Sequence, residues 1–143
     1  MDNKKYDSLK LDNQLCFPLY AVSRKIVKTY TPFLKPLGLT YTQYITLMVL
    51  WEEKEVKIKD LGERLYLDTG TLTPLLKKME EGGLLKRERS MSDERVVNVS
   101  ITKKGMELRE KSLAIPKKVG SCINLSPKEM ETLISMLHKL FNF

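Results

Sequence analysis

Residues 67–105 read LDTGTLTPLLKKMEEGGLLKRERSMSDERVVNVSITKKG, and this stretch decides the expected fold. A helical pattern runs from a capping residue to the pair Gly82-Gly83, which is typical of a helix end. Strand signals follow at 84–89 and 96–101, with a charged loop between them. A helix followed directly by a basic hairpin favours a winged helix-turn-helix, whose helix enters the major groove of duplex DNA.

The helix in this stretch has one apolar face and one polar face. Asp68 or Thr69 caps its start, and steps of about 100° per residue place the leucines and Met79 opposite small or basic residues. Glycine and threonine allow close approach to base edges, while lysines supply charge to phosphates. The residues expected to contact DNA are Thr69, Thr71, Thr73, Pro74, Lys77 and Lys78. The alternative, a solvated helix face in another kind of domain, leaves the hairpin unexplained.

The hairpin supplies the second set of candidate DNA contacts. Arg95 suits the narrow, negative minor groove, and Asp93 is placed to hold its guanidinium by a bidentate pair. Arg87, with Lys86 and Arg89, is expected to contact phosphates. A plain charged hairpin without a partner is the alternative interpretation.

Further helices surround this stretch. Apolar residues at helical spacing predict a helix over 13–31, which starts or kinks near Pro18. Pro32 and Pro36 are expected to break it. Thr40 then begins a capping box, Thr-Tyr-Thr-Gln, which predicts the start of a second helix.

The pattern continues with shorter elements. Ile58, Leu61 and Leu65 mark a short third helix, with a minimal strand possible at 56–58. Thr102 is expected to cap a helix that reaches about Val119. The last helix begins at the capping box Ser-Pro-Lys-Glu, residues 126–129, and continues with apolar residues at helical spacing.

The predicted fold class is mainly α with a small β wing, in a single domain over 1–143. Residues 40–104 form the winged-helix lobe, and residues 1–37 and 105–143 form N- and C-terminal dimerisation helices. Such outer helices with apolar stripes favour a homodimer, because two copies match the two-fold symmetry of operator DNA.

Composition limits the function classes. The 143 residues are 42% hydrophobic and 30% charged, and the net charge of +7 suits a nucleic-acid partner. The sequence lacks a membrane-spanning stretch and a signal-peptide core, so we expect a cytoplasmic protein. It has neither a glycine-rich phosphate loop nor a Ser-His-Asp arrangement, and its lone histidine, His138, disfavours a metal site. We therefore expect no cofactor and no enzymatic activity.

Cys16 lies near the start of the first predicted helix. The positive end of a helix dipole favours a thiolate, which is the form that attacks a peroxide oxygen. Tyr20, Tyr30 and Tyr41 lie in adjoining segments, and each can donate an O–H to a thiolate. Chemistry alone slightly favours the alternative, in which Cys16 is a small buried apolar residue.

The motifs LGERLYLDTGTLTPLLKKME, DER and SITKKG resemble the MarR family of dimeric winged-helix regulators over essentially the whole chain. LDNQLCFPLYA and LTYTQY are similar to the organic hydroperoxide regulators (OhrR) within it. The resemblance implies that Cys16 is the reactive cysteine. It also implies that Tyr30 and Tyr41 hydrogen-bond to this thiol across the dimer, with Tyr20 nearby.

The resemblance further implies a transcriptional repressor. A reduced homodimer binds double-stranded operator DNA, and organic hydroperoxide acts as the inducer by oxidising Cys16. The chain resembles those relatives with a second cysteine, here Cys122, which forms a disulfide with Cys16 of the other subunit. A small thiol in place of Cys122, or an inert Cys122, remains open.

Three alternatives stay open at this point. The first is a MarR-type repressor released by a small aromatic ligand bound between the dimer helices and the wings. The second is release by general thiol oxidants. The third, a thiol peroxidase that uses Cys16 and Cys122, leaves the wing and the DNA-facing helix unexplained.

Overall fold

The first half of the fold is built around a helix that begins at a capping box. The structure, a computed structural model, describes residues 3–141. The Thr40 hydroxyl accepts the backbone N–H of Gln43 at 3.3 Å, and the Gln43 side chain accepts the Thr40 N–H at 2.9 Å. This starts helix α2 (Tyr41–Glu53), as predicted. Leu47 and Leu50 on α2 are fully buried, and α2 contacts α3, α4, α5, β1 and β3.

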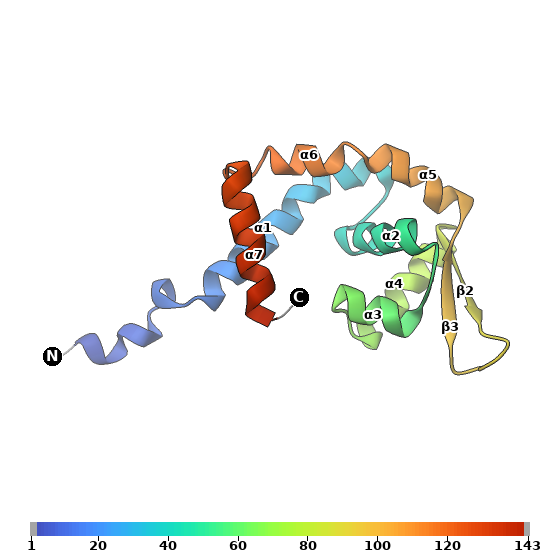
Figure 1. Cartoon of the computed structure of the whole chain (residues 1–143), viewed down its shortest axis with the longest axis horizontal. Helices are drawn as coiled ribbons and strands as arrows, with labels where there is room; N and C mark the ends of the chain where they lie inside the picture. Colours follow the sequence, from blue (N-terminus) through green and yellow to red (C-terminus); the bar gives the residue numbers. More distant parts are fainter. Residues whose placement is uncertain (1–2, 142–143) are drawn as a thin grey trace. The chain divides into compact units, whose positions relative to one another are not determined.

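The chain forms two compact units that divide between Leu113 and Ala114. The bounds in the first unit are η1 (Asn3–Leu9), η2 (Leu11–Asn13), α1 (Cys16–Leu34), η3 (Lys35–Leu37), α2 (Tyr41–Glu53), β1 (Glu55–Lys57), α3 (Ile58–Leu65), α4 (Thr69–Glu81), β2 (Leu85–Arg89), β3 (Val97–Ile101) and α5 (Lys103–Ser112). The second unit contains α6 (Ile115–Gly120) and α7 (Pro127–Phe141). Figure 1 labels the seven α-helices and the strands β2 and β3 along the chain.

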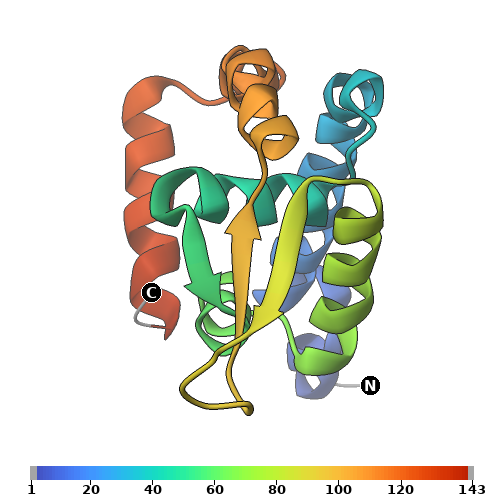
Figure 2. The same cartoon turned by 90° about the vertical axis from the view of Figure 1, so that its right-hand side faces the viewer.

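The three strands form one antiparallel sheet in the order β1-β3-β2. Val99 at the centre of β3 pairs with Val56 on β1 and with Arg87 on β2. Val99 is fully buried, and β3 lies between its two neighbours in Figure 2. The hairpin at 84–101 and the minimal strand expected near 56–58 are therefore confirmed.

Helix α4 begins and ends where its sequence signals place the bounds. The Asp68 carboxylate accepts the backbone N–H of Thr71 at 2.9 Å, so Asp68 is the N-cap. Leu72, Leu76 and Met79 are buried on the predicted inner face. The helix stops before a glycine pair, and Gly83 has the left-handed φ of 74° that terminates many helices.

The first predicted helix has different ends from those expected. It begins at Cys16, so Pro18 lies in the first turn. Backbone N–H groups in a first turn have no acceptor within the helix, so the N–H that proline lacks is not needed there. The expectation that Pro32 breaks this helix was wrong, because α1 continues to Leu34. Pro32 lies in the last turn. The helical hydrogen bond that spans it is kept, because the Lys35 N–H donates to the Thr31 carbonyl.

The helix expected to run from Thr102 to about Val119 is divided into α5 and α6. Pro116 explains the break, since its ring would clash with the carbonyl four residues earlier, that of Ser112. Ser112 is the last residue of α5, and Pro116 lies in the first turn of α6. The boundary between the two units follows at Leu113.

This break leaves α5 in the first unit. The Thr102 hydroxyl accepts the Gly105 N–H at 3.1 Å, and the Trp51 indole donates to the Gly105 carbonyl at 2.9 Å. The start of α5 is therefore fixed to α2. Residues 1, 2, 142 and 143 of the expected outer segments lie outside the described residues.

Two helices carry exposed apolar side chains. Within α1 the buried residue is Leu34, while Phe17, Leu19, Val22 and Val27 are 36–51% exposed. Helix α7, which starts at the predicted Ser126 capping box, exposes Leu133, Ile134, Met136 and Leu140. Over residues 3–141, no helix is both long and apolar enough to cross a membrane.

Gly105→Ala tests the close packing between α5 and the hairpin. An added Cβ would collide with the Leu84 carbonyl oxygen and lie 2.8 Å from Ile101 Cγ1. We expect a loss of about 1–3 kcal/mol in the free energy of unfolding, measured by urea denaturation. The control is Gly120→Ala, where a Cβ meets no atom within 4 Å. Equal stability of the two variants would contradict this packing.

Candidate functional site

An open groove brings the start of α4 and the hairpin to one face of the first unit. It lies between α3, α4 and the strands of the sheet, and its lining includes Thr69, Thr73 and Arg95. Lys57 and Lys59, at the end of β1 and the start of α3, line the same groove. Sequence reasoning missed these two lysines, because only the fold brings them beside the hairpin.

The polar face of α4 is open to solvent, as its pattern predicts. The six candidate residues Thr69, Thr71, Thr73, Pro74, Lys77 and Lys78 are all exposed. The Thr71 hydroxyl donates to the Asp68 carboxylate at 3.1 Å, and the two bonds from Thr71 hold the pKa of Asp68 below its usual range. The donor of this hydroxyl is therefore occupied, which leaves the Thr71 methyl and the two lone pairs of its oxygen for a partner.

The hairpin loop is shaped by Asp93, but not in the expected way. Its carboxylate accepts the backbone N–H of Arg95 at 3.0 Å, and its carbonyl accepts the Val96 N–H at 2.9 Å. Within residues 3–141 no ion pair joins the Asp93 carboxylate to the Arg95 guanidinium. The expected bidentate pair is corrected: Asp93 forms the turn that presents an exposed Arg95.

Arg87 connects the hairpin to α4. Its guanidinium donates to Glu80 Oε2 at 2.8 and 3.0 Å, and its backbone N–H donates to Glu80 Oε1 at 2.8 Å. These bonds hold the pKa of Glu80 below its usual range. The charge of Arg87 is therefore compensated within the fold, whereas Lys86 and Arg89 on the same strand are exposed.

Cys16 occupies the first position of α1 and is exposed. One turn later, the Tyr20 phenol oxygen accepts a hydrogen bond from Arg24 Nη1 at 2.6 Å. Cys122, in the second unit between α6 and α7, is also exposed, and its thiol donates to the Lys118 carbonyl at 3.4 Å. The described residues contain no group of three His, Cys, Asp or Glu side chains that could hold a metal ion.

The tyrosines expected near the thiol form a cluster at the far end of α1. The ring centroids of Tyr30 and Tyr41 are 4.8 Å apart, and Tyr44 lies 5.8 Å from Tyr30. Burial raises the pKa of each of these phenols, and the neighbouring phenols raise that of Tyr30 further. They therefore remain protonated hydrogen-bond donors at neutral pH. Tyr44 was not predicted, since its position on α2 reads as ordinary core.

Within one chain this cluster cannot contact the thiol. Cys16 and Tyr30 lie at opposite ends of α1, and the rise of an α-helix places them about 21 Å apart. The structure thus brings Tyr20 near Cys16 but leaves Tyr30 and Tyr41 remote. Contact between these groups requires a second copy of the chain.

Comparison with known proteins agrees with this architecture. Residues 28–112 match the family model described as transcriptional regulator SarA/Rot. The organic hydroperoxide resistance transcriptional regulator of Bacillus subtilis is 48% identical over 141 residues, which cover 99% of this chain and 93% of that protein.

Solved structures of AbfR, a protein of Staphylococcus epidermidis, share the fold. Reduced AbfR bound to DNA gives a TM-score of 0.79 at 36% identity, covering 98% of this chain and 94% of that one. Disulfide-formed AbfR gives 0.65 at 38% identity, covering 98% of each chain. These matches confirm the predicted fold class.

Glu80→Gln tests the link between α4 and the hairpin. A carboxyl whose pKa is lowered by folding stabilises the native state above its unfolded pKa, and this contribution disappears as the pH falls through the folded pKa. We therefore expect the variant to melt below the unchanged protein at pH 7, with the difference in Tm vanishing in acid. Differential scanning calorimetry from pH 7 to pH 3 measures this.

The control for this experiment is Glu81→Gln, which removes the same charge from the next, exposed residue. A Tm difference that is equal for the two variants, or independent of pH, would rule out a specific role for the Glu80 carboxylate.

Proposed function

The chain belongs to the SarA/Rot family of transcriptional regulators, within the MarR-type winged-helix proteins, and we propose that it is a redox-sensing repressor. Its reduced homodimer binds operator DNA and is released when an organic hydroperoxide oxidises Cys16. The observation that carries this proposal is an exposed thiol at the first residue of α1, separated from its own tyrosine cluster by the length of that helix.

Double-stranded DNA is the partner that suits the face of α4 and the hairpin. Helix α4 offers small and basic exposed residues to the major groove, from Thr69 to Lys78. Arg95 on the exposed loop enters the minor groove, and Asp93 fixes the turn that presents it. Lys57, Lys59 and the exposed cations of β2 lie beside this surface and neutralise phosphates.

Homodimerisation is supported by the apolar surface of α1. Burying Leu15, Leu19 and Val22, which share one side of the helix, against a second chain removes apolar area from water, which stabilises by about 25 cal/mol per Å². A two-fold dimer then presents two α4 helices about 34 Å apart, which is one turn of the operator.

The sensing step is the attack of Cys16 on the hydroperoxide. The thiolate sulfur donates an electron pair to the outer oxygen, so that an S–O bond forms and the O–O bond breaks. Sulfur is oxidised to sulfenic acid, and the departing alkoxide takes a proton from solvent to become an alcohol. Tyr30 and Tyr41 of the partner subunit, kept protonated by burial, donate hydrogen bonds to this sulfur.

Cys122 resolves the oxidised thiol. Its sulfur attacks the sulfenic sulfur of Cys16 in the other subunit, an S–S bond forms, and the sulfenic oxygen leaves as water. The exposure of both thiols supports this pairing. Disulfide formation shifts α1 of one subunit against the other, which changes the spacing of the two α4 helices. Because the operator fixes that spacing, the dimer is released.

Cys16→Ser tests the switch. The variant should bind a duplex selected from a random library with the affinity of the reduced protein, and should stay bound after cumene hydroperoxide is added. The unchanged protein should lose affinity roughly 5- to 150-fold, the usual range of such coupling. Fluorescence anisotropy measures both. Release of the serine variant by the peroxide would refute the thiol switch.

Arg95→Ala tests the minor-groove contact. Its loss should weaken binding to the selected duplex by about 1–3 kcal/mol, which anisotropy titration measures at fixed salt. The control is Lys111→Ala, which removes a charge from an exposed position on α5 outside the groove. Equal losses for the two variants would show that only net charge matters, and would exclude a groove contact by Arg95.

A further inference from the structure

A row of three side chains on α1 points to one more residue of the sensing site. Cys16, Tyr20 and Arg24 follow one another at intervals of four, so they are neighbours along one side of the helix. We propose that Arg24 is a positioning residue that directs the Tyr20 hydroxyl toward the Cys16 sulfur. This inference rests on the proposed function, because it concerns the reaction of Cys16 with hydroperoxide.

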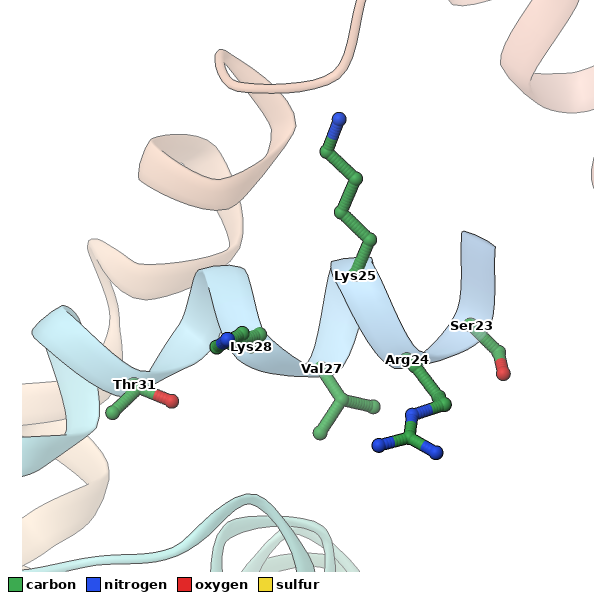
Figure 3. A pocket seen from close by; sticks show the side chains of 6 residues that line it. All are labelled: Ser23, Arg24, Lys25, Val27, Lys28 and Thr31. Atoms are coloured by element: carbon green, nitrogen blue, oxygen red, sulfur yellow. The ribbon is translucent and has the colours of Figure 1, made fainter. Parts of the chain in front are cut away.

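The contact between Arg24 and Tyr20 fixes the phenol in two ways. Arg24 Nη1 donates to the phenol oxygen at 2.6 Å, and the guanidinium carbon lies 5.4 Å from the ring centroid. A hydrogen bond with a charged donor is stronger than a neutral one, and a cation over the ring adds attraction. Figure 3 shows Arg24 leaving α1 on the side away from Lys25.

The contact with Arg24 leaves the hydrogen of the Tyr20 hydroxyl available. A guanidinium has no acceptor, so the phenol oxygen accepts from Arg24 and its single O–H is left to donate elsewhere. Side chains on a helix lean toward its N-terminus. Arg24 therefore leans over Tyr20, and Tyr20 leans toward Cys16 at the first position of the helix.

The charge of Arg24 strengthens this donor. Accepting a bond from a cation draws electron density from the phenol oxygen, which makes its O–H a better donor to a thiolate. The Tyr20 hydroxyl then stabilises the negative sulfur before it attacks the peroxide. Tyr20 and Arg24 lie on the same helix as the thiol, so this donor does not depend on the position of the partner subunit.

The experiment follows oxidation of Cys16 alone, in a Cys122→Ser background. The rate of free-thiol loss with cumene hydroperoxide is measured for the parent and for Arg24→Gln. Losing one hydrogen bond that acts on a charged group should slow the reaction roughly tenfold. The control Lys25→Gln removes an adjacent charge that points the other way, and its rate should match the parent.

A double-mutant cycle shows whether Arg24 acts through Tyr20. Tyr20→Phe should slow oxidation by a similar factor, and adding Arg24→Gln to it should slow oxidation no further. Arg24→Lys keeps a donor and should recover part of the rate, which a purely structural role would not predict. Retained binding to the selected duplex shows that each variant is folded.

Three results would overturn this inference. The first is an Arg24→Gln rate equal to that of the parent, and the second is an equal slowing by Lys25→Gln. The third is an undiminished effect of Arg24→Gln in the Tyr20→Phe background. In each of these cases the parent still reacts and the thiol switch stands. A parent protein whose Cys16 does not react at all would instead remove the proposed function, and this inference with it.

Discussion

The apolar surface of α1 is the constraint on which the rest of the arrangement depends. This helix buries Leu34 within its own unit and leaves one side, with Leu15, Leu19 and Val22, exposed to water. Such a surface favours a partner, since covering it removes apolar area from solvent. The same helix carries the exposed Cys16 thiol at one end and Tyr30 near the other. A second antiparallel copy of α1 would therefore cover the surface and bring a tyrosine to each thiol.

The DNA-facing surface is held as one body by contacts of a different kind. Trp51 on α2 donates to the Gly105 carbonyl, which fixes α5, and Glu80 binds both the side chain and the backbone of Arg87, which fixes the hairpin to α4. Within this lobe there is little that a redox change at Cys16 could rearrange. In the proposed switch, a signal from the thiol would therefore act on the placement of whole lobes, to which the spacing of the operator half-sites is sensitive.

Local signals predicted the starts of elements well, because a capping side chain and the N–H that it binds lie within three residues. Thr40, Asp68 and Ser126 each cap the helix expected of them. Proline was harder to interpret: Pro32 is tolerated in a last turn, whereas Pro116 ends a helix. The side-chain pairing of Arg87 and the turn at Asp93 were missed, since both depend on neighbours that only the folded chain supplies.

The candidate thiol site was predictable in its residue types and not in its geometry. A sequence shows Cys16 beside Tyr20, but the separation of about 21 Å from Tyr30 follows only once α1 is seen to be continuous through Pro32. That continuity divides the hydrogen-bond donors into two sets. Tyr20 with Arg24 belongs to the thiol's own helix, and in the proposed dimer the Tyr30 cluster would come from the other subunit. In the proposed dimer, reactivity and assembly would thus depend on the same helix, so that oxidation of one sulfur could alter how the two subunits are held.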